Sequence, residues 1–288
     1  MFTSDQSINR STWRLIIHGP APGAWNMAVD EAMAQATAAG HAPPTLRFYA
    51  WSPPCLSLGR HQPLHEVDVA RCRLGGVDIV RRPTGGRAIL HTDELTYSVV
   101  APPGEALVAG AVMDAYHRIS EGLVAGLRLL GVPAEEAPGS NRAGPDVSAA
   151  CFEVPSAYEI TAKGRKLMGS AQSRRVDWVL QHGSLPLYGD VTRIVDYLAL
   201  DSEEARQALR ETLRMRATTV EAVLGYRVGF NEAAEAMARG FAQALPVVLI
   251  RGELSHEEIA AAERLVAEKY GAEAWTARLH TGIAQRAA

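Results

Sequence analysis

The sequence reads Val80-Arg81-Arg82-Pro83-Thr84-Gly85-Gly86-Arg87-Ala88-Ile89-Leu90-His91 at the point around which the rest is organised. Apolar residues lead into this stretch and out of it, whereas arginines, a proline and a glycine pair fill its centre, which predicts a strand, a loop and a strand. Glycines lack a Cβ, so the loop backbone can take positive φ and approach a ligand, and the three arginines add fixed positive charge. Such a loop suits a carboxylate, thioester or phosphate. An ordinary glycine turn with solvated arginines explains the same residues equally well.

Hydrophobic periodicity extends the prediction to both sides of the loop. Period-two alternation and short apolar runs predict strands at 13–18, 46–50, 55–58, 95–100, 178–185 and 247–250, and a hairpin around Lys163-Gly164. Helical spacing predicts helices at 25–39, 67–74, 108–130, 192–200, 202–214, 219–224, 231–243 and 255–270, the last with a capping box from Ser255 to Glu258. Asp30 and Glu31 are interpreted as exposed acids of a packing helix. Residues 134–150 are rich in Gly, Pro and acids and are expected to form a long exposed loop.

Composition limits the classes of protein. The chain has 288 residues and a formal net charge of −3, which argues against bulk nucleic-acid binding and against a polybasic membrane anchor. The first ten residues lack the apolar core of a signal peptide, and no apolar run is long enough to span a bilayer. We therefore expect a cytoplasmic protein, and a monomer because no heptad pattern is sustained. One main domain over 11–250 is expected, with 251–288 as a helical extension packed on it.

The chain has three cysteines, Cys55, Cys72 and Cys151. Their odd number and wide spacing argue against a disulfide framework and against a Cys-x-x-Cys metal site. Cys55 falls in an apolar strand and Cys72 in a short helix, and both are expected to be buried small hydrophobic residues. Cys151 follows the Gly- and Pro-rich segment. A lone cysteine is more often structural than catalytic, so its position alone leaves its role open.

The motif from Arg81 to His91, followed by Glu94-Leu95-Thr96-Tyr97-Ser98, resembles the acyl-binding loop of the biotin/lipoate protein ligase superfamily. Residues 26–32 resemble that superfamily's first helix, residues 164–172 its lysine-bearing hairpin and residues 269–275 its C-terminal helix, so the resemblance covers about 13–275. It implies an α+β fold with a mixed sheet flanked by helices and a helical C-terminal subregion. Arg87 stands where lipoate-protein ligases usually carry a third glycine. The resulting Thr84-Gly85-Gly86-Arg87 sequence resembles that of the octanoyltransferases that use a cysteine nucleophile.

The resemblance also implies a reaction. An octanoyl group would pass from octanoyl-acyl carrier protein to Cys151, and then to a lysine of a lipoyl-domain protein such as glycine cleavage H protein, in lipoate biosynthesis. Lys166 would contact the acyl carbonyl, and no cofactor or metal is implied. The residues expected to bind substrate are Arg81, Arg82, Thr84, Gly85, Gly86, Arg87, His91, Gly169, Ser170 and His182. The arginines of the loop, together with Arg60, Arg174 and Arg175, are candidates to guide the acidic carrier or its phosphopantetheine phosphate.

Several alternatives stay open. His91 and His182 are candidates to deprotonate the attacking lysine, although the residues alone favour a hydrogen-bonded structural histidine at each position. An ATP-dependent lipoate-protein ligase would use the same loop and the same lysine. An amidotransferase that moves octanoate between lipoyl proteins would also use a cysteine, and a non-catalytic lipoyl-carrier binding protein would retain the surface without the chemistry.

Overall fold

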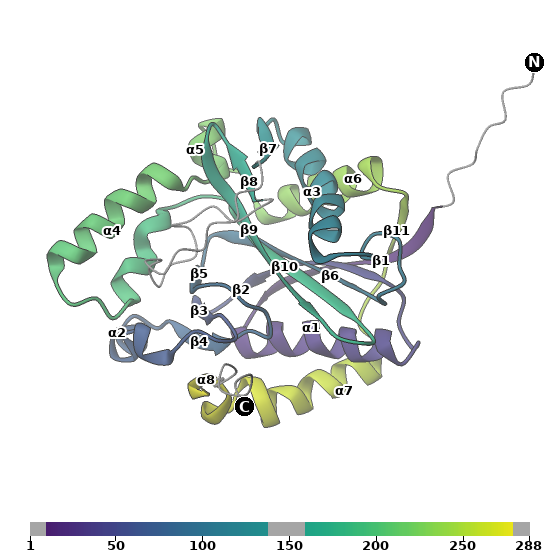
Figure 1. Cartoon of the computed structure of the whole chain (residues 1–288), viewed down its shortest axis with the longest axis horizontal. Helices are drawn as coiled ribbons and strands as arrows, with labels where there is room; N and C mark the ends of the chain where they lie inside the picture. The colour runs from purple at the N-terminus through teal and green to yellow at the C-terminus, as the bar shows by residue number, and fades with distance from the viewer. Residues whose placement is uncertain (1–9, 138–158, 279–288) are drawn as a thin grey trace, which may run out of the picture.

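An eight-stranded mixed sheet forms the centre of the computed structural model, which describes residues 10–137 and 159–278 (Figure 1). Its strands lie in the order β11-β1-β2-β6-β10-β9-β8-β7. The pairs β11/β1 and β1/β2 are parallel, and the remaining pairs are antiparallel. The strands are β1 Ser11–Ala21, β2 Thr45–Trp51, β6 Glu94–Ala101, β7 Ala134–Glu136, β8 Ile160–Ala162, β9 Arg165–Arg174, β10 Val179–Pro186 and β11 Val247–Arg251. The structure thus confirms the predicted mixed sheet flanked by helices.

Helices cover both faces of this sheet (Figure 1). On one face α3 (Val112–Leu129) packs on α6 (Phe230–Ala244), and their apolar sides close the largest core together with Trp13, Phe48 and Leu95. On the other face α1 (Gly23–Ala38) lies against the strands and is covered in turn by α7 (His256–Leu265). The remaining helical segments are η1 Leu64–Glu66, α2 Val69–Leu74, η3 Val191–Tyr197, α4 Glu203–Arg216, α5 Val220–Leu224, η4 Val266–Tyr270 and α8 Glu273–Ala277.

The segment 80–91 belongs to a second, three-stranded sheet, and we call its loop, residues 82–88, the glycine loop. Strands β4 (Asp78–Arg81) and β5 (Ile89–His91) flank the loop as predicted, but they do not pair with each other. Both pair with β3 (Cys55–Leu58), β4 in parallel and β5 antiparallel. Because β3 lies between β4 and β5, these two strands and the loop that joins them are not a hairpin. Apolar side chains from α2, η3 and α4 support this small sheet on one side.

Two predicted boundaries are wrong, and the structure gives a reason for each. The helix expected from residue 108 begins at Val112, because Gly110 has φ of 85° and the Asp114 carboxylate accepts a hydrogen bond from the Ala111 amide at 3.2 Å. Residues 134–136 are strand β7 and not part of a loop, because they pair with β8. The rest of that expected loop, together with Cys151, lies outside the described residues.

Local signals located other elements correctly. The predicted hairpin turn has Lys163 at φ 51° and Gly164 at φ 75°, the left-handed conformation that a two-residue hairpin loop requires. Ser255 caps α7 as predicted: its hydroxyl accepts from the Glu258 amide at 3.1 Å, and the Glu258 carboxylate accepts from the Ser255 amide at 2.8 Å.

Candidate active site

A pocket opens where the two sheets meet α1. It encloses about 540 Å³ of empty space, including its open mouth. One part of the wall is apolar, from Met27, Trp51 and Ile89, whereas hydroxyl and imidazole groups line another part. The lining residues are Met27, Tyr49, Trp51, Ser57, Arg82, Gly86, Ile89, His91, Thr96, Glu159, Gly169, Ser170, Ala171, His182, Gly183 and Ser184.

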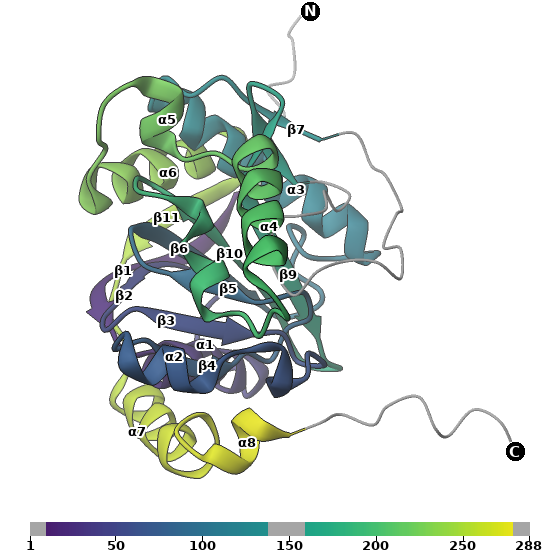
Figure 2. The same cartoon turned by 90° about the vertical axis from the view of Figure 1, so that its left-hand side faces the viewer.

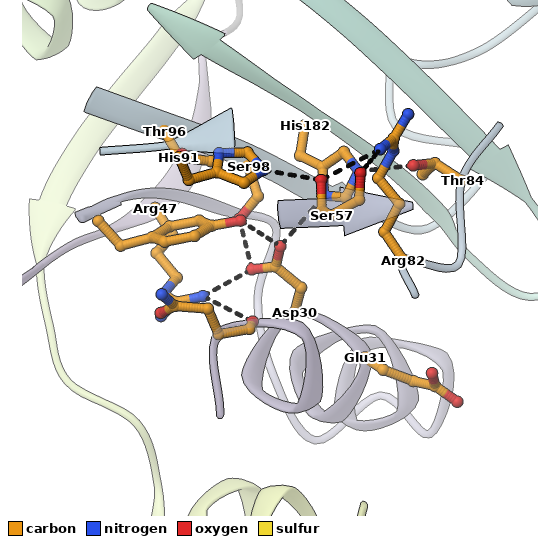
Figure 3. A network of polar contacts seen from close by, with 12 residues as sticks. Asp30, Glu31, Arg47, Ser57, Arg82, Thr84, His91, Thr96, Ser98 and His182 are labelled. Atoms are coloured by element: carbon orange, nitrogen blue, oxygen red, sulfur yellow. Dashed lines mark hydrogen bonds and ion pairs between the residues drawn. The ribbon is translucent and has the colours of Figure 1, made fainter. Parts of the chain in front are cut away.

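Asp30 is the centre of a buried polar network behind this pocket (Figure 3). Its side chain has an exposed fraction of 0% and accepts from Arg47 Nη1 at 2.8 Å, from Ser98 Oγ at 2.9 Å and from Tyr49 Oη at 2.9 Å. Burial alone would raise the pKa of Asp30, but the hydrogen bond from His182 and the charge of Arg47 outweigh burial and hold this pKa below its ordinary value. The carboxylate is therefore ionised at neutral pH.

The expectation that Asp30 and Glu31 are exposed acids is wrong. Glu31 points away from the network on another side of α1 (Figure 3), where it is mostly buried and accepts from Lys269 Nζ at 2.6 Å. The Tyr270 hydroxyl also donates to it. Helical spacing did not predict this burial, because burial of a charge requires partners that spacing does not reveal.

His182 connects Asp30 to the glycine loop. Its Nδ1 lies 3.4 Å from Asp30 Oδ2, and its Nε2 lies 2.6 Å from Thr84 Oγ1. Burial lowers the pKa of His182 more than Asp30 raises it, so the imidazole is neutral at pH 7. A neutral ring with its proton on Nδ1 donates to the carboxylate and accepts from the Thr84 hydroxyl, which satisfies all three groups.

A second carboxylate and histidine stand on the other side of the pocket. His91 Nδ1 lies 2.7 Å from Glu94 Oε1, and His91 Nε2 lies 2.8 Å from Ser57 Oγ. The His91 ring stacks on Trp51 with centroids 3.9 Å apart. Burial would raise the pKa of Glu94, but His91, Ser184 and Thr96 together lower it below its ordinary value. Both candidate histidines are therefore hydrogen-bonded at both ring nitrogens.

Two of the three loop arginines, Arg81 and Arg82, are buried and hold the backbone. Arg81, with an exposed fraction of 0%, donates to the carbonyls of Gly59, Gln62 and Thr276 at 2.6–3.0 Å. Arg82 donates to the carbonyls of Ser57, Gly85 and Arg87 at 2.7–3.2 Å and to Ser57 Oγ at 3.1 Å. The role of these two side chains in guiding a carrier protein stays a prediction, and Arg82 also lines the pocket.

Of the two loop glycines, only Gly86 adopts positive φ, at 91°. A Cβ added at Gly59 would lie 1.8 Å from the Gly86 carbonyl oxygen, so the loop rests directly on the backbone that follows β3. At Gly85, by contrast, a Cβ would meet nothing within 4 Å. Close approach thus involves Gly86 and Gly59, and the sequence pattern did not single out Gly59.

Lys166 lies on β9 next to a residue of the pocket wall and is not itself among the lining residues. It is buried, and its ammonium donates to the Glu159 carboxylate, which lines the pocket. The isolated bridge between Lys166 and Ala217, and a hydrogen bond from the Thr218 amide to the Lys166 carbonyl at 2.9 Å, fix its backbone. A lysine on a hairpin surface would be solvated, whereas this one sits inside the protein with a carboxylate beside it.

The predicted substrate residues divide into two groups. Arg82, Gly86, His91, Gly169, Ser170 and His182 line the pocket. Thr84 and Gly85 contact lining residues from behind, Arg81 is directed toward the C-terminal segment, and Arg87 is partly exposed and pairs with Glu66 at 3.1 Å. Cys151, predicted as the nucleophile, lies outside the described residues. Cys55 and Cys72 are both fully buried as predicted, and burial raises the pKa of the Cys72 thiol to about 11.

Sequence reasoning missed four polar groups that organise the site: Asp30, Arg47, Glu94 and Ser57. Arg47 and Ser57 occupy strand positions that read as ordinary alternation, and only the family motif Glu94-Leu95-Thr96 drew attention to Glu94. Within the described ranges no group of three or more His, Cys, Asp or Glu side chains is arranged to hold a metal ion. Every helix of the described ranges falls short of the length or apolarity needed to cross a membrane.

Comparison with known proteins decides the family. Residues 22–242 match the family model described as the lipoyl protein ligase A/B catalytic domain. The chain belongs to this family. Octanoyltransferase LipM of Symbiobacterium thermophilum is 46% identical over 273 residues, which cover 93% of this chain and 99% of the relative. Octanoyltransferase LipM of Carboxydothermus hydrogenoformans is 42% identical over 268 residues, with the same coverage.

Solved structures of this family share the fold. A crystal structure of lipoate-protein ligase A bound with ATP has a TM-score of 0.76 and 26% identity, covering 93% of this chain and 99% of that one. The bipartite lipoate protein ligase of Thermoplasma acidophilum, analysed with its E2 lipoyl domain, has a TM-score of 0.77 at 24% identity and covers 93% and 97% of the two chains. The family shares one architecture between ligases and octanoyltransferases, so the architecture alone does not separate the two activities.

Proposed function

We propose that the chain is an octanoyltransferase of lipoate biosynthesis, which moves an octanoyl group from acyl carrier protein to a lysine of a lipoyl-domain protein through a thioester on Cys151. One observation carries the transferase activity: relatives that are 37–46% identical over at least 90% of the chain are named octanoyltransferases. The ligases among the solved structures are at most 26% identical.

The proposed reaction has two displacements at one carbonyl carbon. In the first, the Cys151 thiolate attacks the octanoyl thioester, the bond to the phosphopantetheine sulfur breaks, and the carrier leaves as a thiol after taking up a proton. In the second, the lysine amine attacks the Cys151 thioester, loses a proton and forms an amide while the cysteine leaves as a thiolate. Splitting the transfer in this way gives ping-pong kinetics.

The buried thiols support the choice of nucleophile. Cys55 and Cys72 have exposed fractions of 0%, and burial raises the pKa of both. A nucleophilic cysteine needs the opposite conditions, namely access to substrate and a lowered pKa. Cys151 is the third cysteine of the chain, and the resemblance to octanoyltransferases that use a cysteine implies that it is the nucleophile.

Lys166 and Glu159 are proposed to stabilise the oxyanion. The Lys166 ammonium donates to the Glu159 carboxylate, which lines the pocket, and a cationic donor held there would stabilise the negative charge that develops on the acyl oxygen. Loss of one such donor typically costs a factor of about 10²–10³ in rate. Lys166→Met should slow acylation by that factor. Lys163→Met is the matched control, because Lys163 sits in the turn of the same hairpin and donates to the Val223 carbonyl.

His91 and His182 are proposed to act on the proton of the acceptor lysine through their neighbours. Each ring already bonds a carboxylate and a hydroxyl. Ser57, the hydroxyl partner of His91, lines the pocket and would be the group that faces the substrate amine, whereas Thr84, the partner of His182, lies behind the wall. We also propose a cytoplasmic monomer in which the residues from 251 onward are an extension of the same catalytic domain.

The test uses octanoyl-acyl carrier protein with no ATP. The protein should gain the mass of one octanoyl group, the adduct should be released by hydroxylamine, and a lipoyl-domain acceptor should discharge it. Cys151→Ala should gain nothing, whereas Cys72→Ala should behave like the unchanged protein. An adduct that needs ATP, or one that persists in Cys151→Ala, would overturn the proposal in favour of a ligase or another nucleophile.

A further inference from the structure

Arg60, which is tied to the glycine loop, lies near two arginines from distant parts of the sequence. Arg60 follows β3, Arg175 lies in the turn between β9 and β10, and Arg278 follows α8. Arg60 is half-buried, and Arg175 and Arg278 are exposed. Burial lowers the pKa of Arg60, and the positive charges of Arg175 and Arg278 lower it further. We call these residues the arginine cluster.

The fold holds the arginine cluster in place through its backbone. The Arg60 amide donates to the Thr84 carbonyl at 2.8 Å, which ties Arg60 to the glycine loop. Arg81 donates to the Thr276 carbonyl at 2.7 Å and to the Gly59 carbonyl at 2.8 Å, so one buried guanidinium joins the segments that carry Arg60 and Arg278. Figure 2 shows α8 beneath β4, and the Trp275 indole donates to the Arg81 carbonyl at 2.9 Å.

Carboxylates do not neutralise the arginine cluster. Among the described residues, no Asp or Glu oxygen lies within 4.0 Å of a nitrogen of these three side chains, in contrast to Arg14, Arg47 and Arg87, each of which has an acidic partner. Glu31 is near, but Lys269 and Tyr270 already bind it. The Nε of Arg60 is buried and has no hydrogen-bond partner. A buried donor without a partner is costly, so this site favours an anion that can satisfy it.

We propose that the arginine cluster binds the phosphate of the phosphopantetheine arm of the acyl carrier protein. This inference rests on the proposed function, since the arm carries the octanoyl thioester. Guanidinium groups bind phosphate through paired, charge-assisted hydrogen bonds. Three guanidinium groups offer more N–H donors than the two oxygens of a single carboxylate can accept, which favours a phosphate. Its position fits the substrate: Arg60 is bonded to Thr84, and Thr84 is bonded to His182 on the pocket wall. The arm would bring the thioester into the pocket while its phosphate stays outside on the arginines.

The test uses the full chain and two small thioesters that differ only in the phosphate, octanoyl-4′-phosphopantetheine and octanoyl-pantetheine. The rate at which the Cys151 adduct forms is measured with each thioester. The unchanged protein should react with the phosphorylated compound at least about tenfold faster per mole, as expected for one charge-assisted hydrogen bond. Arg60→Gln and Arg278→Gln should remove most of this preference and leave the rate with octanoyl-pantetheine unchanged. Arg239→Gln on α6 is the control, an exposed arginine on the other face of the sheet.

The outcomes separate the two proposals. If neither thioester nor octanoyl-acyl carrier protein acylates Cys151, the proposed function is wrong. If both thioesters react equally in the unchanged protein, or if the preference survives in Arg60→Gln and Arg278→Gln, the phosphate inference is wrong while the proposed function stands. It is also wrong if these variants slow only the intact carrier protein, because the arginines then bind its acidic surface. Arg278→Gln, an exposed position, keeps the test valid if Arg60→Gln does not fold.

Discussion

Asp30→Asn tests whether the buried network behind the pocket depends on one negative charge. Asp30 faces four donors, from Arg47, Tyr49, Ser98 and His182, at 2.8–3.4 Å. An asparagine keeps the shape but brings one carbonyl oxygen and two donors to a place where acceptors are needed. It also leaves the Arg47 guanidinium, with an exposed fraction of 0%, without a counter-charge.

The expected loss is large. Breaking a buried ion pair by removing one partner costs about 3–5 kcal/mol, which is a substantial part of the 5–15 kcal/mol typical of a whole domain. Urea unfolding followed by tryptophan fluorescence measures this free energy of unfolding. Glu31→Gln is the matched control, because Glu31 is the next residue of the same helix and its partner Lys269 is partly exposed. We expect that control to cost about 1 kcal/mol or less.

A double-mutant cycle then identifies the cause. If the stranded charge of Arg47 dominates, Asp30→Asn combined with Arg47→Met should be more stable than the sum of the two single changes predicts, by about 1–3 kcal/mol. The reasoning is refuted if Asp30→Asn costs no more than Glu31→Gln, or if the two changes are simply additive.

Three further predictions follow from the same contacts. Gly86→Ala should lose about 1–2 kcal/mol of stability, because Gly86 has φ of 91°, whereas Gly85→Ala should change little; equal urea midpoints would contradict this difference. Stability should fall as the pH drops below about 6.5, because burial lowers the pKa of His18 to about 4 and also lowers that of His182, so the unfolded chain binds these protons first. His18→Asn should make the free energy of unfolding depend less on pH in this range. Asp30 and Glu94, whose pKa values are also lowered, should lose their contributions to stability only at still lower pH. A free energy of unfolding that does not change between pH 7 and 5 would refute the role given to the two histidines. Iodoacetamide should leave Cys55 and Cys72 unmodified in the folded protein and modify both in urea, because both thiols are buried. Peptide mass spectrometry measures the modification, and a label on either cysteine in the folded protein would mean that its thiol is accessible to the reagent.

Local patterns predicted the local structure of this protein. The Lys163-Gly164 turn and the Ser255 cap depend on residues within four positions of each other, so the sequence displays the interaction directly. The family motif located the pocket for the same reason, because the glycine loop and the residues around His91 form one continuous segment.

Interactions between distant segments were not predicted. The burial of Asp30 depends on Arg47, Ser98 and His182, which come from three strands that become neighbours only in the folded sheet. Strand β7 was read as a loop because its partner β8 lies beyond residue 158. The loop arginines were assigned to the surface because arginine usually is exposed, whereas here a ring of carbonyl oxygens surrounds Arg81.

Arg81 has one consequence for how the protein is made and handled. Its guanidinium joins residues 59–62 to the carbonyl of Thr276, nearly two hundred positions later in the chain. During synthesis, residues 59–62 and Arg81 leave the ribosome well before Thr276, whose carbonyl binds Arg81 in the folded protein. Shortened chains that end before α8 should consequently retain the main sheet yet hold a loosened glycine loop, and a tag fused directly behind Arg278 would press on the same place.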